Sequence, residues 1–258
     1  MRHSLMLRAR GDPAEAINLA LAARDAGFHG VYVTERHLDS GDGFANAFAV
    51  AAAISGRLQR TFIGVVPSLG MEHPLRVVEQ ANMLNILTRG RSIVVLSDRL
   101  EPRQYAAFGL PVPRNGLLED LVQHLEDAWS WDYQDDGPPL EFHNGPYAAK
   151  MAGRIMPASR PRLALETESE HGVRDAARRG WAIQLRVNHL EKTRKLIDTY
   201  RDVLSSTGHS FRIVQDCLDG VAVIVGERFE GSIAELERIG AAEVRFDFAP
   251  EAAIRIVG

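Results

Sequence analysis

The chain has 258 residues, 45% of them hydrophobic and 25% charged, which is enough to bury a large core as one α/β barrel or two small domains. Its formal net charge is −4 with acidic and basic residues interspersed, which argues against a nucleic-acid partner. The single cysteine, Cys217, excludes an intramolecular disulfide and a cysteine-based zinc site. The longest apolar run, 44–54, is too short and too rich in alanine to span a bilayer. We therefore expect a cytoplasmic protein with no membrane partner and no metal site.

Short β-branched runs alternate with segments of helical periodicity along the chain, a pattern that predicts parallel strands joined by helical crossovers. In the first helix, Asp12 is the expected N-cap, Pro13 the first helical residue and Gly27 the stop. The elements predicted in the first half are strand His3–Arg8, that helix, strand Gly30–Thr34, helix Phe44–Leu58, strand Thr61–Pro67, helix Pro74–Leu87, strand Arg91–Leu96 and helix Leu117–Trp131.

The second half begins with a segment rich in Asp, Gly and Pro, from Asp132 to Arg160. It is too long for a tight barrel connection, so we expect a hairpin or a lid over a functional site. The elements predicted after it are strand Arg162–Leu165, helix Ser169–Arg179, strand Trp181–Leu185, helix His189–Ser206, a strand within Phe211–Val225 interrupted near Asp219-Gly220, helix Ser232–Ile239 and strand Glu243–Phe248. Only a short tail follows, which predicts a vestigial last helix.

Eight strands in series, most of them separated by a helix, predict a (β/α)8 TIM barrel that forms one domain over residues 1–258. An open doubly wound sheet is less favoured because no glycine-rich dinucleotide motif follows the first strand. In a barrel of this kind the functional residues lie at the C-terminal ends of the strands, and those ends therefore hold the candidate site residues.

Several of these predicted strand ends carry polar residues. Thr34-Glu35-Arg36-His37 could move protons and hold an anion, or it could be an ion pair closing the rim beside a solvated histidine. Ser97-Asp98-Arg99 could contact a polar ligand or form a rim salt bridge. Ser169 could bind phosphate with the first N–H groups of its helix, or serve as a plain N-cap. His73, before a helix-starting proline, is interpreted as a cap or packing residue rather than a catalyst.

Taken together, these segments resemble the bacterial luciferase-like, flavin-dependent monooxygenase family. DPAEAINLALAARDAGFHGVYVTERHL is similar to the family's opening helix and second strand. HPLRVVEQANMLNILTRGR, residues 73–91, resembles its most characteristic stretch, and ESEHGVRDAARRGW, residues 168–181, resembles its serine-led helix after the fifth strand. The resemblance covers most of residues 12–185.

The resemblance implies FMN at the barrel mouth, reduced by a separate flavin reductase and used with O2 to oxidise a small organic substrate. In catalysis, His37 is the acid–base candidate, and it matches the histidine next to the one usually credited with catalysis. Arg36 would stabilise developing negative charge. The residues that match the cofactor site are Val65 and Val66 against the flavin, Ser97 beside its ring, Glu168 and Ser169 at the phosphate, and Arg99 and Arg114 as cations that would offset Asp98.

Three features depart from the family pattern. Arg36 replaces the first histidine of a Glu-His-His motif, and Asp98 stands where a phosphate-binding arginine is expected. The connection after the seventh strand lacks the usual long insertion. Two alternatives therefore remain open: a flavin- or ligand-binding barrel without turnover, similar to the non-fluorescent flavoproteins, and an oxidoreductase that transfers hydride with a deazaflavin.

The segment FANAFAVAAAISGRL, residues 44–58, is apolar on nearly every side, although an outer barrel helix needs only one apolar stripe. We expect a homodimer formed through the second and third helices, which the resemblance also implies. The alternative is burial of this helix under the chain's own long loops.

Overall fold

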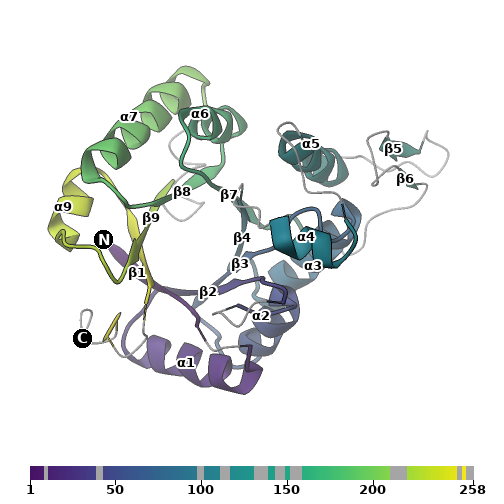
Figure 1. The fold of residues 1–258 in the computed structure, drawn as a ribbon, viewed down its shortest axis with the longest axis horizontal. Helices are drawn as coiled ribbons and strands as arrows, with labels where there is room; N and C mark the ends of the chain where they lie inside the picture. The colour runs from purple at the N-terminus through teal and green to yellow at the C-terminus, as the bar shows by residue number, and fades with distance from the viewer. Residues whose placement is uncertain are drawn as a thin grey trace.

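The structure is a computed structural model that describes residues 1–8, 11–38, 43–97, 102–110, 117–130, 139–142, 149–151, 159–209, 220–248 and 252–253. Eight parallel strands close into a barrel in the order β1-β10-β9-β8-β7-β4-β3-β2. Figure 1 shows these strands around a central axis with the helices outside them. The predicted (β/α)8 fold is confirmed.

The elements of the barrel agree with the predicted ones to within a few residues at most boundaries. The strands are β1 (Arg2–Met6), β2 (Gly30–Thr34), β3 (Phe62–Val66), β4 (Ser92–Ser97), β7 (Arg162–Glu166), β8 (Ala182–Arg186), β9 (Val221–Gly226) and β10 (Glu243–Asp247). The helices are α1 (Pro13–Asp25), α2 (Ala47–Ser55), α3 (Pro74–Leu87), α4 (Pro102–Ala107), α5 (Leu117–Ser130), α6 (Glu170–Arg179), α7 (Leu190–Ser206) and α9 (Ile233–Arg238). The short helix α4 was not predicted.

Several of these helices begin where a side chain can accept a hydrogen bond from an otherwise unpaired backbone N–H. Asp12 caps α1 by accepting from the Ala14 N–H at 2.8 Å. The imidazole Nδ1 of His73 accepts from the Leu75 N–H at 3.2 Å at the start of α3. The interpretation of His73 as a cap is therefore confirmed.

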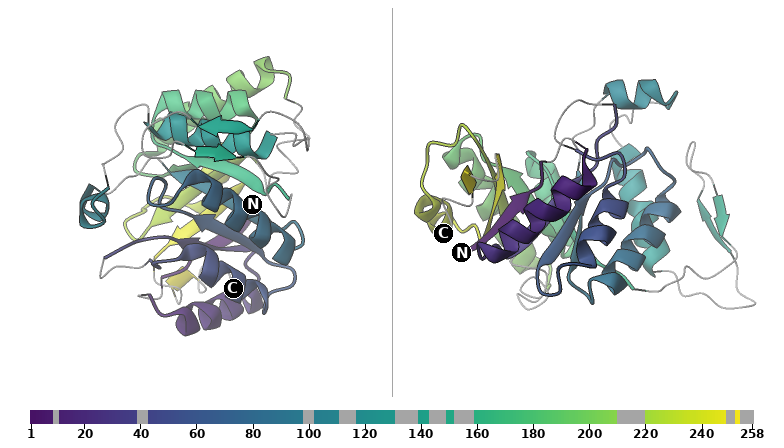
Figure 2. Two further views of the ribbon diagram at one scale, coloured as in Figure 1. Left: turned by 90° about the vertical axis from the view of Figure 1, so that its right-hand side faces the viewer. Right: turned by 90° about the horizontal axis from the view of Figure 1, so that it is seen from below.

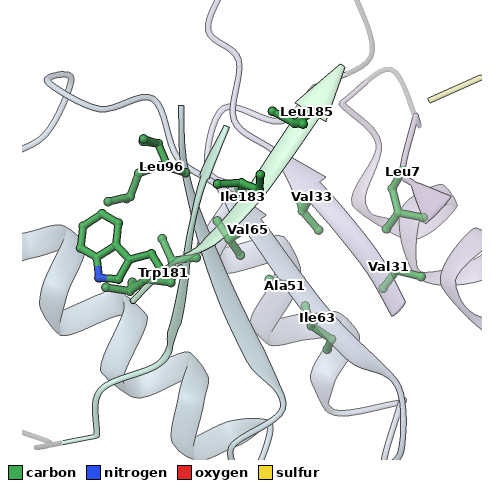
Figure 3. Packing of buried hydrophobic residues seen from close by; sticks show 14 of the residues in the cluster. Leu7, Val31, Val33, Ala51, Ile63, Val65, Leu96, Trp181, Ile183 and Leu185 are labelled. Atoms are coloured by element: carbon green, nitrogen blue, oxygen red, sulfur yellow. The ribbon is translucent and has the colours of Figure 1, made fainter. Parts of the chain in front are cut away.

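The strands separate two packed layers, because alternate side chains point out toward the helices and into the barrel. Figure 3 shows part of the outer layer, in which Val31 and Val33 of β2 and Ile63 and Val65 of β3 lie near Ala51 of α2. The inner layer has its own apolar cluster, made of Met6, Tyr32, Val66, Ile93, Val95, Ala164 and Ala182.

The inner layer also contains a buried ion pair. The Arg245 and Glu243 side chains are each only 1% exposed, with Nη2 and Oε2 3.0 Å apart. The Arg245 guanidinium lies 3.8 Å from the ring centroid of Tyr32 and also donates to the Gln184 amide oxygen. On the neighbouring strand β3, the register partner of Tyr32 is Gly64. A Cβ added at Gly64 would come within 1.9 Å of the Tyr32 ring. The Arg245 guanidinium stacked on the Tyr32 ring thus fills part of the barrel interior.

The segment predicted to be a hairpin or a lid contains an antiparallel hairpin, β5 (Leu140–Phe142) with β6 (Ala149–Met151). This hairpin lies beyond α5, away from the barrel axis (Figures 1 and 2). The prediction of a hairpin is confirmed. The described residues of this segment do not form the alternative, a lid over the barrel mouth.

The connection from β9 to α9 consists of residues 227–232 and is as short as predicted. The strand predicted as the seventh is β9, which begins at Val221. The earlier part of its predicted range, 211–219, lies outside the described residues. After β10 only 252–253 are described, in helical conformation.

Candidate functional site

The C-terminal ends of the parallel strands meet at one end of the barrel, called the mouth below. The inward-pointing side chains at these ends include Val66 on β3, Ser97 on β4 and Glu166 on β7. Ser97 and Glu166 are register partners, and Glu166 accepts a hydrogen bond from Gln184 at 3.0 Å. A ligand in the mouth would therefore meet an apolar wall from Val66 beside polar groups of β4 and β7.

A carboxylate and an imidazole come together directly after β2. His37 Nε2 lies 3.2 Å from Glu35 Oε1, and both side chains are largely buried. The Glu35 carboxylate also accepts from the backbone N–H groups of Ser68 and Ala47, at 3.3 and 3.4 Å. Burial raises the pKa of Glu35 above its ordinary value although these hydrogen bonds act in the opposite direction. The pair can therefore hold and exchange a proton at the mouth.

Packing fixes the histidine of this pair. The His37 ring meets the edge of Phe108, with ring centroids 5.2 Å apart at an interplanar angle of 77°. Phe108 follows α4, the helix that was not predicted. A contact between residues 37 and 108 could not be anticipated from local sequence patterns.

Arg36 is positioned by backbone pairing with a later segment. Its N–H donates to the Phe44 carbonyl at 2.9 Å, and the Phe44 N–H donates to the Thr34 carbonyl at 3.0 Å. A Cβ on Gly43 would lie 2.5 Å from Arg36 Cβ, so glycine leaves room for this side chain. The structure also joins His37 to Glu35. The sequence analysis placed Glu35 in the same polar group after the strand but did not name it as a catalytic residue.

The turn between β7 and α6 is stiffened by its own side chains. Ser169 Oγ accepts from the Gly172 N–H at 3.1 Å as the N-cap of α6. Thr167 Oγ1 lies 3.1 Å from Ser169 Oγ and accepts from the Ser169 N–H at 3.2 Å. A Cβ on Gly172 would come within 2.4 Å of Thr167 Oγ1, so glycine is needed there. Such a helix start offers N–H donors to an anion.

Beside this turn lies a shallow pocket to which Glu168, His189 and Lys192 contribute. The Glu168 carboxylate is 3.5 Å from Asn188 Nδ2 in the same pocket. Arg186 also lines this pocket, which therefore combines two cations, one anion and several hydrogen-bonding groups.

The remaining residues predicted to line the site either lie away from the barrel mouth or fall outside the described residues. Val65 is fully buried in the outer layer (Figure 3), so the prediction that it faces a ligand does not hold, whereas Val66 points into the barrel. Asp98, Arg99 and Arg114 lie outside the described residues. Within the described ranges, no three His, Cys, Asp or Glu side chains are arranged as metal ligands. None of the helices in the described part of the chain has the length and apolar character needed to cross a bilayer.

The fold and this arrangement can be compared with known proteins. The family model of luciferase-like monooxygenases matches residues 1–242. The chain belongs to the luciferase-like monooxygenase family. Membership agrees with the sequence resemblance and with the position of the polar residues at the barrel mouth.

Among curated relatives in this family, the alkanal monooxygenase beta chain of Photorhabdus laumondii is 26% identical over 204 residues, covering 72% of this chain and 60% of the relative. The alpha chain of Photorhabdus luminescens is 21% identical over 215 residues, covering 81% and 58%. The chain thus spans about three fifths of the length of these luciferase-like relatives.

Solved structures share the luciferase-like barrel. The monooxygenase RslO1 from Streptomyces bottropensis superimposes with a TM-score of 0.72 at 18% identity, covering 88% of this chain and 71% of that one. An F420-dependent secondary alcohol dehydrogenase, solved with an F420-acetone adduct, gives a TM-score of 0.77 at 14% identity and covers 99% and 97%. At these identities the likeness establishes the fold.

Proposed function

We propose that this protein is an FMN-dependent monooxygenase that uses reduced flavin and O2 to oxidise a small organic substrate. The observation that carries the proposal is the buried Glu35–His37 pair at the mouth of a luciferase-like barrel. Desolvated carboxylate–imidazole pairs are typical of acid–base sites. Family membership supplies the flavin chemistry that such a pair would serve.

The residues at the mouth fit FMN. The stiff turn at Ser169 offers helix N–H groups to a phosphate, and Lys192 supplies positive charge in the adjoining pocket. Glu168 opposes the phosphate charge, whereas Arg186, which lines the same pocket, adds to the positive charge of Lys192. Val66 and Ser97 would border the ring, since both point into the mouth. When bound, the flavin supplies the electrons for reaction with oxygen.

The protein's own share of the reaction is proton handling and exclusion of water. Glu35 fixes the His37 ring through the 3.2 Å contact with Nε2, so His37 can give a proton to the substrate or take one from it. Phe108 covers the imidazole and limits access of water. Arg36 is proposed to stabilise negative charge that develops at the mouth.

Hydride transfer with a deazaflavin is the second candidate function, because this chain matches two F420-dependent enzymes over nearly their whole length. This chain covers 97% of the F420-dependent alcohol dehydrogenase and 96% of a coenzyme F420-dependent tetrahydromethanopterin reductase, but only 58–60% of the alkanal monooxygenase chains named above. A compact barrel of this length is therefore compatible with either cofactor. A flavin-binding barrel without turnover is the remaining outcome that the test below distinguishes.

We further propose that the protein is a cytoplasmic homodimer that receives its flavin from a separate reductase. The outward-facing positions of α2 are small, for example Ala49 and Ala53, and α3 carries the larger apolar residues. Met83, Ile86 and Leu87 are each 47–48% exposed, and their spacing places them on one helix face. This apolar patch is where a second copy would pack.

The test of function is an oxygen-mixing experiment. Protein is loaded anaerobically with reduced FMN and mixed with aerated buffer, and flavin reoxidation is followed by absorbance. We expect reoxidation to differ in rate from that of free flavin and a His37→Gln variant to change it. If bound flavin reoxidises at the free rate in both proteins, the barrel binds flavin without turnover. If reduced FMN does not bind, while a reduced deazaflavin does, the second candidate replaces the first.

A further inference from the structure

Side chains with unpaired nitrogen atoms gather at the end of the barrel opposite the mouth, where the strands begin. His29 directly precedes β2, Arg91 directly precedes β4, and Arg162 is the first residue of β7. His29 Nε2, Arg91 Nε and Arg162 Nη1 are buried and have no hydrogen-bond partner among the described residues. Strands β2, β3, β4 and β7 are neighbours in the closed barrel (Figure 1), so these residues lie along one arc of its rim.

The side chain of Phe62, the first residue of β3, connects this arc. Its ring centroid lies 4.9 Å from that of His29, at an interplanar angle of 31°, and 4.9 Å from the guanidinium carbon of Arg162. The Phe62 N–H donates to the His29 carbonyl at 3.0 Å. On the other side, the Ile63 N–H donates to the Arg91 carbonyl, also at 3.0 Å. Stacking occupies a face of the Arg162 guanidinium and leaves its in-plane N–H groups for an acceptor.

This end of the barrel carries a surplus of positive charge. Neither Arg91 nor Arg162 forms an ion pair with a described carboxylate. The exposed side chains of Arg60 and Arg89, shortly before Phe62 and Arg91, likewise form none within the described ranges. Carboxylates at this end are held by cations of their own, as in the pairs Glu243–Arg245, Asp25–Arg24, Glu126–Arg160 and Glu237 with the N-terminal amine. The surplus is local, because the whole chain has a net charge of −4.

The positive charge acts on His29. Burial lowers the pKa of His29 below its ordinary value, and the charges of Arg2 and Arg162 lower it further. Glu243 acts in the opposite direction without reversing the shift. The His29 ring is therefore mostly neutral at pH 7 and has one N–H to donate. An anion beside this ring would also meet the charges of Arg2 and Arg162.

The chemistry of the unpaired groups selects a small ligand that is rich in acceptors. Guanidinium nitrogens donate hydrogen bonds and cannot accept them, and a buried donor without an acceptor is costly. A tetrahedral oxyanion offers several charged acceptor oxygens, which suit two guanidiniums better than water does. The side chains of His29, Arg91 and Arg162 are each partly exposed, so a change of side-chain rotamer brings their donors to an approaching ion. Burial of the nitrogen atoms themselves favours a small ion over a protein partner.

This cluster lies far from the proposed FMN site. Arg91 precedes β4 and Ser97 ends it, so the two residues lie roughly 20 Å apart at about 3.3 Å per residue. Ser169, proposed to bind the FMN phosphate, follows β7 at the mouth, whereas Arg162 begins that strand at the opposite end. An ion bound beside Arg91 and Arg162 is therefore separate from the cofactor phosphate, and this inference does not rest on the proposed function.

We propose that His29, Arg91 and Arg162 form a binding site for a small tetrahedral oxyanion, such as phosphate, at the N-terminal end of the barrel. Arg91 and Arg162 donate charge-assisted hydrogen bonds to the ion, and His29 donates one more. Phe62 is a positioning residue, because its ring holds His29 and Arg162 by stacking. The bound ion links the starts of β2, β4 and β7 and so stabilises the closed barrel.

The test is a calorimetric titration of the whole protein with sodium phosphate, with sodium chloride holding the ionic strength constant. We expect saturable binding of phosphate and a higher melting temperature in phosphate than in chloride. Arg162→Gln should weaken phosphate binding at least tenfold, the loss expected for one charge-assisted hydrogen bond. Arg91→Gln should have the same effect while keeping the stacking on Phe62, which covers the case that Arg162→Gln fails to fold. Arg194→Gln, on the outer helix α7, removes the same charge and should leave phosphate binding unchanged.

The titration is repeated anaerobically with saturating reduced FMN and with the Ser169→Ala variant. Phosphate binding should persist in both, because the proposed cofactor site lies at the other end of the barrel. Complete displacement of phosphate by FMN would place the ion at the mouth and overturn the proposal. Phosphate that binds no more tightly than chloride would also overturn it, and so would binding that both Arg162→Gln and Arg91→Gln leave unchanged.

Discussion

Replacing Arg245 by methionine tests the account of the barrel interior most severely. The substitution keeps an unbranched stem, shortens the side chain and removes its charge. Glu243, 1% exposed, would lose its partner at 3.0 Å and retain the Tyr32 hydroxyl at 3.5 Å. Breaking a buried pair by removing one member costs about 3–5 kcal/mol. Since domains are stable by roughly 5–15 kcal/mol, Arg245→Met should remove a large fraction of the stability.

The effect depends on pH with a defined sign. Burial raises the pKa of Glu243, but Arg245 outweighs it and the pKa in the folded state lies below its ordinary value. A carboxylate of this kind contributes stability above its unfolded pKa, and this contribution is lost as the pH falls through the folded pKa. In Arg245→Met the compensation is gone and burial dominates, so stability should instead fall as the pH rises.

Urea denaturation at several pH values measures both effects. The matched control is the double variant Arg245→Met with Glu243→Leu, which removes both charges and should recover most of the loss. A single variant as stable as the wild-type protein near neutral pH, or a double variant no more stable than the single one, would refute a stabilising role for the Arg245–Glu243 pair.

Four further outcomes are expected. His37→Gln should lower turnover about 10²–10⁴-fold with little change in melting temperature; unchanged turnover would remove its assignment. Gly64→Ala places a methyl group against the Tyr32 ring and should cost about 1–3 kcal/mol by thermal denaturation, so an unchanged melting temperature would contradict the packing. Ser169→Ala should cost about 1 kcal/mol and weaken reduced FMN more than reduced riboflavin; equal weakening would exclude a phosphate site. Ile86→Lys should convert a dimer to a monomer by light scattering, and a monomeric wild-type protein would disprove the dimer.

The fold could be predicted because its signals are local and repeated. Asp12 with Pro13, and the glycine stop at Gly180, where φ is 69°, mark helix ends by side-chain and backbone chemistry alone. Strands were recognisable as β-branched runs between such signals. The start of the seventh strand stays a prediction, because 211–219 lie outside the described residues.

Site residues could be predicted from the sequence only where their position just after a strand was enough to place them at the mouth. His37 and Ser169 follow strands directly, and the structure places both at the mouth. Strand order alone did not predict three features: the Glu35–His37 contact, the position of Val65 in the outer layer, and the convergence of Arg8 and Arg186 on Asp247. These features depend on which way a side chain points at a strand end and on strands that are distant in sequence. The alternation along a strand does favour Val66 over Val65, but only once the register is known.

The most direct measurement of the central claim is the affinity of the protein for reduced cofactors under anaerobic conditions, determined by fluorescence titration. We predict saturable binding of one reduced FMN per chain, tighter than that of oxidised FMN and of a reduced deazaflavin, and weakened by Ser169→Ala. No binding of any of these cofactors, or tighter binding of the reduced deazaflavin, would contradict it.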